Sequence, residues 1–351
     1  MEHSIALVTG ATSGLGYAAA RALAGDGWRE IIVTGRSLTR VRETAAQLAA
    51  EVGRQVFTPL ELDLDKPSSV QSALAELVKR GRPIDFLLLN AGLLPGKKRV
   101  LTTAGVELSQ APLIGHHQLT VGLLPGNKRV LTAAGVELSQ APLVGHHQLT
   151  VGLLRANLLS PNARIVISGA EPARGDMALF SLTDVADFAA KHHQGDRTAA
   201  VEALLRNGPN VKYVPNRAYA DAKLIITWWV AALARRLPSG MAVYAVAPGS
   251  APDTKAPRNA GLVVKWVMIP LLKLIPGMTM TPETAARRYL QASEFGTDVS
   301  GHFFASAPRK LTGPIEAMRH PHFHDRANQE AAWQAVVKVS SVDLSDGQGL
   351  H

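Results

Sequence analysis

A glycine-rich turn near the N-terminus constrains the fold of this 351-residue chain more than any other feature. The β-branched and apolar run at residues 4–9 predicts a short strand, and the turn at 9–16 (Thr-Gly-Ala-Thr-Ser-Gly-Leu-Gly) follows it directly. An alanine-rich stretch then predicts a helix over 15–26. Gly10 permits a tight turn, and Gly16 permits close packing of the helix on the strand. The chain therefore begins with a strand–turn–helix unit.

The first two-thirds of the chain repeats this alternation of short β-branched runs with longer alanine- and leucine-rich stretches. Residues 86–89 are apolar without alternation, as expected of a strand covered by helices on both faces. We expect an α/β fold with a doubly wound parallel sheet in a single domain over residues 1–310. The expected strands are 4–9, 30–34, 56–63, 84–90, 164–168 and 241–247, and the expected helices are 15–26, 38–52, 68–80 and 220–236.

Composition excludes several functional classes. The chain has no cysteine, which excludes disulfides, a thiolate nucleophile and cysteine-ligated metal centres. Its net charge of +9 comes from dispersed basic residues without interleaved aromatics, so we expect no nucleic-acid partner. The most apolar stretch, 261–274, contains Lys265, Pro270 and Lys273 and is too short to span a bilayer. Without a signal-like N-terminus, we expect a cytoplasmic protein.

An internal repeat interrupts the αβ pattern. Residues 93–122 and 123–152 are identical at all but three positions, which indicates a tandem duplication. Only the second copy continues into the apolar run 153–159, whereas the first soon meets Pro125. We expect the second copy to form the helix after the fourth strand. The first copy is then an insert near the mouth of the site.

The glycine turn predicts a dinucleotide-binding site of the Rossmann type. Gly14 lets a pyrophosphate approach the backbone, and the N-terminus of the following helix offers free N–H groups to phosphates. Residues after the third, fourth and sixth strands lie at the same edge of a parallel sheet. The expected cofactor contacts are Gly10, Thr12, Ser13, Gly14, Leu15, Gly16, Asp63, Leu64, Asn90, Ala91, Gly92, Pro248 and Gly249.

The end of the second strand bears on the choice between NADP and NAD. An acidic residue there would bind the ribose hydroxyls of NAD, but this chain has Arg36, with Arg40 beyond it. A planar guanidinium suits a 2′-phosphate, so we expect NADP(H) in preference to NAD(H). The alternative is that Arg36 is a solvated loop charge.

A tyrosine and a lysine provide the expected catalytic groups. Tyr219 and Lys223 stand four residues apart on an expected helix and therefore share one face. A nearby ammonium favours the phenolate, which would bring Tyr219 within reach of proton transfer near neutral pH. Both residues would also contact the cofactor.

Together these motifs resemble the short-chain dehydrogenase/reductase family, and within it the longer members of the retinol-dehydrogenase-like branch. The resemblance covers roughly residues 4–310, through the glycine turn, Asp63, Asn90-Ala91-Gly92, Gly145-His146-His147, Tyr219-x3-Lys223 and Pro248-Gly249. It implies a sheet of about seven strands and NAD(P)-dependent interconversion of carbonyls and alcohols. It also implies a Ser-Tyr-Lys site assisted by an asparagine, with Tyr219 as proton donor or acceptor and Lys223 as its partner. Pairing of subunits through the helices after strands four and five, as a homodimer, is a further implication.

Two positions depart from the family pattern. Ala170 stands where the family places its catalytic serine, and Pro142 (Pro112 in the first copy) replaces the helix asparagine. Ser168 is a candidate catalytic residue two positions upstream, although a strand-end serine held by a structural hydrogen bond explains it more simply. The leading hypothesis is an NADP-dependent ketoreductase-like oxidoreductase. The alternative is a cofactor-binding protein that is redox-silent or catalyses a cyclase- or isomerase-like reaction.

Three further segments shape the expected substrate side. Residues 171–217 form a longer insertion than the family usually carries, with expected helices at 182–191 and 198–206. Residues 261–280 resemble an apolar lid, which favours a hydrophobic small-molecule substrate. Residues 311–351 form a looser C-terminal extension. The histidines at 192–193 and in the tail lack the spacing of a metal site, so we expect no metal.

Overall fold

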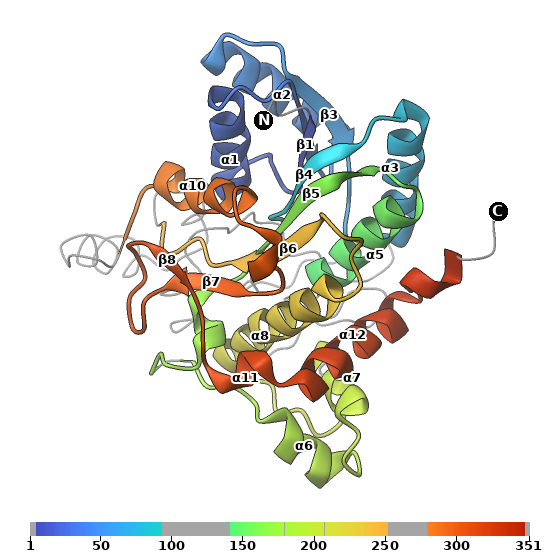
Figure 1. Cartoon of the computed structure of the whole chain (residues 1–351), viewed down its shortest axis with the longest axis vertical. Helices are drawn as coiled ribbons and strands as arrows, with labels where there is room; N and C mark the ends of the chain where they lie inside the picture. Colours follow the sequence, from blue (N-terminus) through green and yellow to red (C-terminus); the bar gives the residue numbers. More distant parts are fainter. Residues whose placement is uncertain (1–4, 93–140, 179, 207, 252–278, 348–351) are drawn as a thin grey trace.

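The computed structural model describes residues 5–92, 141–178, 180–206, 208–251 and 279–347 (Figure 1). A single twisted sheet runs through these residues in the order β3-β2-β1-β4-β5-β6-β7-β8. The doubly wound α/β fold is therefore confirmed. The strands are β1 Ile5–Val8, β2 Glu30–Gly35, β3 Phe57–Glu61, β4 Ile84–Leu89, β5 Leu159–Ser168, β6 Ala242–Val246, β7 Phe303–Ser306 and β8 Ile315–Ala317.

The sheet has one strand more than the expected seven. All neighbouring strands up to β7 pair in parallel, and β8 pairs antiparallel with β7, with Ala305 opposite Glu316. β1 lies between β2 and β4, so the direction of strand progression reverses there. A crevice at the carboxyl ends of the strands on either side of such a reversal is the usual ligand site of open α/β sheets.

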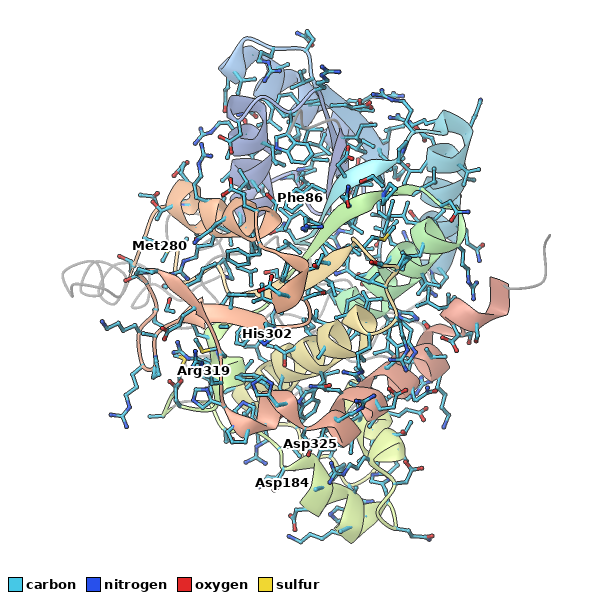
Figure 2. The ribbon with its side chains drawn as sticks, viewed as in Figure 1. Phe86, Asp184, Met280, His302, Arg319 and Asp325 are labelled. Carbon is cyan, nitrogen blue, oxygen red and sulfur yellow. The ribbon has the colours of Figure 1, made fainter. Side chains whose placement is uncertain are left out.

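Helices cover both faces of the sheet. α1, α2 and α10 lie on one face, and α3, α5 and α8 lie on the other (Figure 1). On the α1 side lies Phe86 of β4, which is labelled in Figure 2. It packs against Trp28 with ring centroids 5.8 Å apart. The helices are α1 Gly14–Gly25, α2 Leu38–Val52, α3 Pro67–Arg80, α5 Ala141–Arg155, α6 Val185–His192, α7 Arg197–Arg206, α8 Pro215–Ala234, α10 Pro282–Ser293, α11 Pro321–His324 and α12 Arg326–Ser340.

The second copy of the repeat supplies α5, which is the helix before β5. Its Gly145 packs so tightly that a Cβ there would lie 2.3 Å from the carbonyl oxygen of Leu64. The first copy, 93–122, lies outside the described residues, as does most of the expected lid at 261–280. The expected position of the first copy, at the mouth of the site, stays a prediction.

The C-terminal extension is more ordered than its composition indicates. α12 packs on α5, α7 and α8 (Figure 1). Trp333 stacks on Trp229 with ring centroids 6.3 Å apart. Burial lowers the pKa of His147 to about 4, so this histidine is neutral. Its Nε2–H donates to the carbonyl of Val342 (2.8 Å), and its Nδ1 accepts from Trp229 Nε1 (3.0 Å). The tail is therefore part of the core.

The position of α12 bears on the expected homodimer. The resemblance implies pairing through the helices that follow strands four and five, and α12 of the same chain lies on α5 and α8.

Of the helices in the described ranges, none is both long enough and apolar enough to cross a bilayer. A cytoplasmic location stays a prediction.

Candidate functional site

The turn between β1 and α1 is tight and partly buried. Gly10 and Gly14 adopt positive φ values of 66° and 59°, which favour glycine. A Cβ at Gly16 would lie 2.4 Å from the carbonyl oxygen of Gly10, so a larger residue would push α1 away from the turn. The Ala11 N–H donates to the carbonyl of Thr34 and fixes the turn against the end of β2 (2.9 Å). The N-terminus of α1 therefore lies at the carboxyl edge of the sheet.

The end of β4 is joined to the glycine turn through Asn90 and Thr9. Asn90 Nδ2 donates to the carbonyl of Thr9 (3.0 Å), and the Ala91 N–H donates to Thr9 Oγ1 (3.0 Å). Thr9 Oγ1 also lies 2.9 Å from Nε2 of His146, whose pKa burial lowers to about 3. Asn90 Oδ1 is buried and has no hydrogen-bond partner among the described residues. A buried acceptor of this kind normally has a donor, and a bound ligand could provide it.

The adenosine end of the expected cofactor site carries a positive side chain, Arg36, and a negative one, Asp63. Arg36 is exposed just after β2, and Asp63 is buried after β3 and ion-paired with Lys66 (3.0 Å). Burial, with a smaller contribution from Asp63, raises the pKa of Asp65 to about 6, against a lowering by nearby Arg36. Arg36 thus lies exposed at this end of the site, with its charge close to Asp65.

Tyr219 and Lys223 share one face of α8, as their spacing predicts. Lys223 Nζ lies 5.8 Å from the centre of the Tyr219 ring and donates to the Ser168 carbonyl (2.9 Å). Tyr219 is 2% exposed, and burial raises its pKa well above the usual value, with Glu171 and Tyr289 contributing in the same direction. Burial lowers the pKa of Lys223 to about 8. Desolvation is thus the largest effect on the phenol, and the phenolate expected from the sequence stays a prediction.

Ala170 and Ser168 lie on different sides of the end of β5. Ala170 packs with Tyr219 and Phe180 in a small apolar cluster. Ser168 Oγ instead lies 2.8 Å from the hydroxyl of Tyr289 on α10, across the sheet from α8. The structure thus brings Ala170, and not the Ser168 hydroxyl, against Tyr219. A catalytic role for Ser168 stays a prediction.

A buried network centred on Arg288 was not apparent from the sequence. Arg288 on α10 is 5% exposed, and its Nη1 donates to Oε1 of Glu171 (3.3 Å). Glu171 follows Ala170 in the chain and is fully buried. It also donates to the Ala247 carbonyl (3.1 Å), to Ser306 Oγ (2.9 Å) and to the Gly313 carbonyl (2.7 Å). One guanidinium therefore ties the loop after β5 to the ends of β6 and β7.

The same arginine supports the segment after β6. Gly249 has a φ of 82°, and a Cβ there would lie 2.7 Å from Arg288 Nη1. Pro248 and Gly249 are both buried at the carboxyl end of β6, where the sequence predicts cofactor contacts. Glu171 and Arg288 are far apart in the sequence, so no local sequence pattern indicates that they form an ion pair. Only the fold pairs them.

The insertion between Ala170 and Tyr219 is tied to α8 by Asp221. The Asp221 carboxylate accepts hydrogen bonds from the N–H (2.8 Å) and the hydroxyl (2.7 Å) of Thr183. Burial raises the pKa of Asp221 to about 6 despite these two bonds. α6 and α7, close to their expected positions, follow Thr183 in the chain.

We expect Asp221→Asn to reduce the pH dependence of stability. Because the native pKa lies above the unfolded value, the native state takes up a proton first as pH falls, so this group favours folding below pH 6. That contribution is lost as pH rises through 6. Between pH 7.5 and 5 it amounts to about 1 kcal/mol, which urea unfolding of the wild type and Asp221→Asn would reveal. Asp187→Asn, at an exposed position on α6, should leave the wild-type dependence unchanged.

The expected cofactor residues gather at one edge of the sheet. The glycine turn, Asp63 and Leu64, Asn90 to Gly92, and Pro248 and Gly249 follow β1, β3, β4 and β6 respectively. Within the described residues, no three histidine, aspartate or glutamate side chains gather as a metal site would require. The edge thus presents backbone, hydroxyl, amide, phenol and ammonium groups.

Comparison with known proteins agrees with this geometry. Residues 4–110 match the family model described as short chain dehydrogenase. Over 116 residues the chain is 35% identical to the oxidoreductase fscI of Fusarium equiseti, a match that covers 32% of this chain and 45% of the relative. The chain thus spans less than half the length of this relative and of two further curated relatives that it matches.

Solved structures share the fold over most of the chain. A protein from Mycobacterium Paratuberculosis, described as putative and uncharacterized, aligns with a TM-score of 0.61 at 19% identity, covering 98% of this chain and 95% of that one. A short chain dehydrogenase from Burkholderia cenocepacia, solved with NADP, aligns with a TM-score of 0.53 at 21% identity, covering 85% and 94%. In sequence over residues 4–110, and in fold over the described chain, this protein is similar to the short chain dehydrogenases.

Proposed function

We propose that this protein is an NADP-dependent oxidoreductase that reduces the carbonyl, or oxidises the alcohol, of a hydrophobic small molecule. The observation that carries the proposal is the buried Tyr219, which shares a helix face with Lys223 at the carboxyl edge of the sheet. The glycine turn and Asn90 lie at the same edge. The curated relatives named as oxidoreductases and reductases support the same reaction class.

The residues at this edge fit a nicotinamide dinucleotide. The backbone around Gly10 and Gly16 leaves no room for a Cβ, as a pyrophosphate cradle requires, and Asn90 Oδ1 accepts no hydrogen bond from the residues that the structure describes. Arg36 would hold a 2′-phosphate. When bound, the cofactor would supply or accept the hydride. NADP in the Burkholderia neighbour supports the preference for NADP(H) over NAD(H).

Tyr219 would act as the acid in the reducing direction. Its raised pKa keeps the proton on the phenol until a carbonyl oxygen that gains negative charge accepts it. Lys223, with a pKa of about 8, would stabilise the resulting phenolate and contact the cofactor ribose. Ala170 contributes no hydroxyl to hold the substrate oxygen. The proposed reaction thus depends on Tyr219 and Lys223.

The walls near Tyr219 support an apolar substrate. Phe180 and Ala170 are buried against Tyr219, and Met177 and Leu182 pack on the same cluster. Apolar walls with few polar groups suit a lipophilic ketone or aldehyde. The long insertion at 171–217 that supplies most of these residues supports the retinol-dehydrogenase-like branch.

A second candidate function follows from Ala170. A protein that binds the cofactor but is redox-silent, or that uses the pocket for a cyclase- or isomerase-like reaction, does not need the serine hydroxyl. The apolar packing of Ala170 on Tyr219 favours this alternative. Lys223, whose ammonium faces the Ser168 carbonyl beside Tyr219, favours the oxidoreductase.

The deciding experiment follows NADPH absorbance with a panel of aromatic and aliphatic carbonyls. We expect turnover on hydrophobic members of the panel and its loss in Tyr219→Phe, which keeps the ring and removes the acid. Tight NADPH binding without turnover above that variant on any substrate would contradict the oxidoreductase and favour the second candidate.

We expect Arg36→Asp to weaken NADPH binding at least about 10-fold more than NADH binding, because a carboxylate would replace the phosphate's partner. Titration of cofactor fluorescence measures both constants. Arg42→Gln, at an exposed position on α2, is the matched control and should change neither. Equal weakening of both cofactors by Arg36→Asp would remove the NADP assignment.

A further inference from the structure

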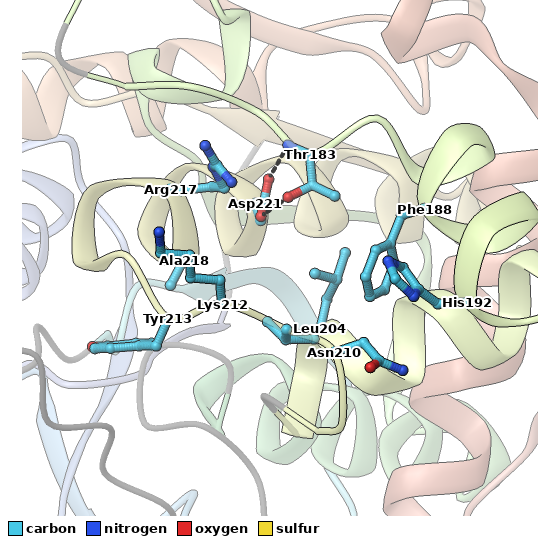
Figure 3. Close-up of a pocket in the computed structure, with 11 residues that line it drawn as sticks. Thr183, Phe188, His192, Leu204, Asn210, Lys212, Tyr213, Arg217, Ala218 and Asp221 are labelled. Atoms are coloured by element: carbon cyan, nitrogen blue, oxygen red, sulfur yellow. Dashed lines mark hydrogen bonds between the residues drawn. The ribbon is translucent and has the colours of Figure 1, made fainter.

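A cavity of about 140 Å³ lies between α6, α7 and the first turns of α8 (Figure 3). Its walls come from the insertion at 171–217 and from α8, with Phe188 and His192 on one side and Arg217 and Ala218 on the opposite side (Figure 3). We propose that this cavity binds a small apolar carboxylate, at a site separate from Tyr219. The inference concerns binding alone and does not depend on the proposed oxidoreductase activity.

The size and walls of the cavity select a ligand of about one ring. Phe188, Leu204, Val211 and Ala218 line it with apolar groups. An apolar protein cavity of about 150 Å³ takes up benzene, so this one matches a single aromatic ring or a short branched chain. Inorganic anions such as phosphate would leave these walls without a partner.

The polar side of the cavity selects a negative charge. Arg217 and Lys212 both line it. Arg217 donates through Nε to Ser181 Oγ (3.0 Å), which leaves the Nη groups of its fork for a carboxylate. Lys212 is exposed and forms no ion pair with any residue in the described ranges. The one acid in the lining, Asp221, is buried and accepts two hydrogen bonds from Thr183. Arg217 also acts on it electrostatically and lowers its pKa, so Lys212 is the cation of the lining that has no acidic partner among the described residues.

The helix geometry separates this cavity from the Tyr219 site. With about 100° of rotation per residue, Arg217, Ala218 and Asp221 occupy one side of α8. Tyr219 and Lys223 then face the opposite side. A ligand in the cavity therefore leaves the surroundings of Tyr219 open, and the two sites should fill independently.

The test titrates the full-length protein with 4-fluorobenzoate, followed by ¹⁹F NMR, and repeats the titration with uncharged 4-fluorobenzyl alcohol. We expect saturable binding of the carboxylate with a dissociation constant on the order of 1 mM, as its few atoms allow. Arg217→Gln should weaken it about 10-fold and Lys212→Gln about 3-fold, with little change for the alcohol. Lys79→Gln, at an exposed position on α3, should bind like the wild type.

Two further measurements locate the binding. Val211→Trp should fill the cavity and abolish binding of both probes, whereas saturating NADPH and Tyr219→Phe should leave the affinity unchanged. Circular dichroism establishes that each variant is folded, and Arg217→Lys, which keeps the charge, should retain most of the affinity. Displacement of the probe by NADPH, or wild-type affinity in folded Arg217→Gln and Val211→Trp, would overturn the proposal.

Discussion

Replacing Ala170 with serine is expected to raise kcat by about 100-fold on any carbonyl that the wild-type protein reduces. Ala170 is 3% exposed and packs against Tyr219, so a hydroxyl added there lies next to the proposed acid. One well-placed donor to a developing oxyanion contributes about 100- to 1,000-fold in kcat. Steady-state kinetics should show the gain mainly in kcat, because the donor is strongest in the transition state.

Ser168→Ala is the matched comparison for this substitution. Its hydroxyl pairs with Tyr289 on the other side of the sheet, so its removal should change kcat little. The expected cost is about 1 to 3 kcal/mol of stability, because Tyr289 is left buried without this partner. Loss of kcat in folded Ser168→Ala would instead support the catalytic role that the sequence predicts for this residue. No gain in Ala170→Ser, despite tight NADPH binding, would favour a redox-silent protein.

Arg288→Met is expected to lower the free energy of unfolding by about 3 to 5 kcal/mol. The substitution keeps much of the side chain's length but leaves Glu171 as a buried carboxylate without this cation. It also removes the donors to the Ala247 and Gly313 carbonyls and to the Ser306 hydroxyl. Urea denaturation, followed by circular dichroism, measures the loss.

An exposed arginine provides the control for this prediction. Arg82 pairs with Glu30 (2.5 Å) but is 57% exposed, so Arg82→Met should cost less than about 1 kcal/mol. The double variant Glu171→Gln/Arg288→Met should recover part of the stability, because the carboxylate that lost the Arg288 cation is replaced by a neutral amide. Similar losses in Arg82→Met and Arg288→Met would show that burial of the pair is not what stabilises the loop after β5.

Local sequence patterns predicted most of the sheet and helices that form the site. The helix expected over 38–52 is α2 itself, and the strands expected around 30–34 and 84–90 differ from β2 and β4 by a single residue. These elements follow from patterns of a few residues. Boundaries that depend on distant packing were less accurate. β5 begins at Leu159 and α8 at Pro215, each five residues earlier than expected.

The tail shows where local patterns fail. Its proline- and glycine-rich start indicated a loose extension, but α12 buries Trp333 against Trp229 and His147. The signal in the sequence was the apolar spacing of the segment that contains Trp333. That spacing indicates a helix only when a partner surface exists, and α5 and α8 form that surface after folding.

The glycine turn by itself determined that the chain begins with a tight β–turn–α unit, because the positive φ at Gly10 favours glycine and a Cβ at Gly16 would clash with the Gly10 carbonyl oxygen. The spacing of Tyr219 and Lys223 likewise determined that they share a helix face. Only the tertiary structure decided the direction in which the pKa of Tyr219 shifts, because burial raises it and Glu171 and Tyr289 act in the same direction. Such desolvation arises from residues that are distant in sequence, and no local pattern contains it.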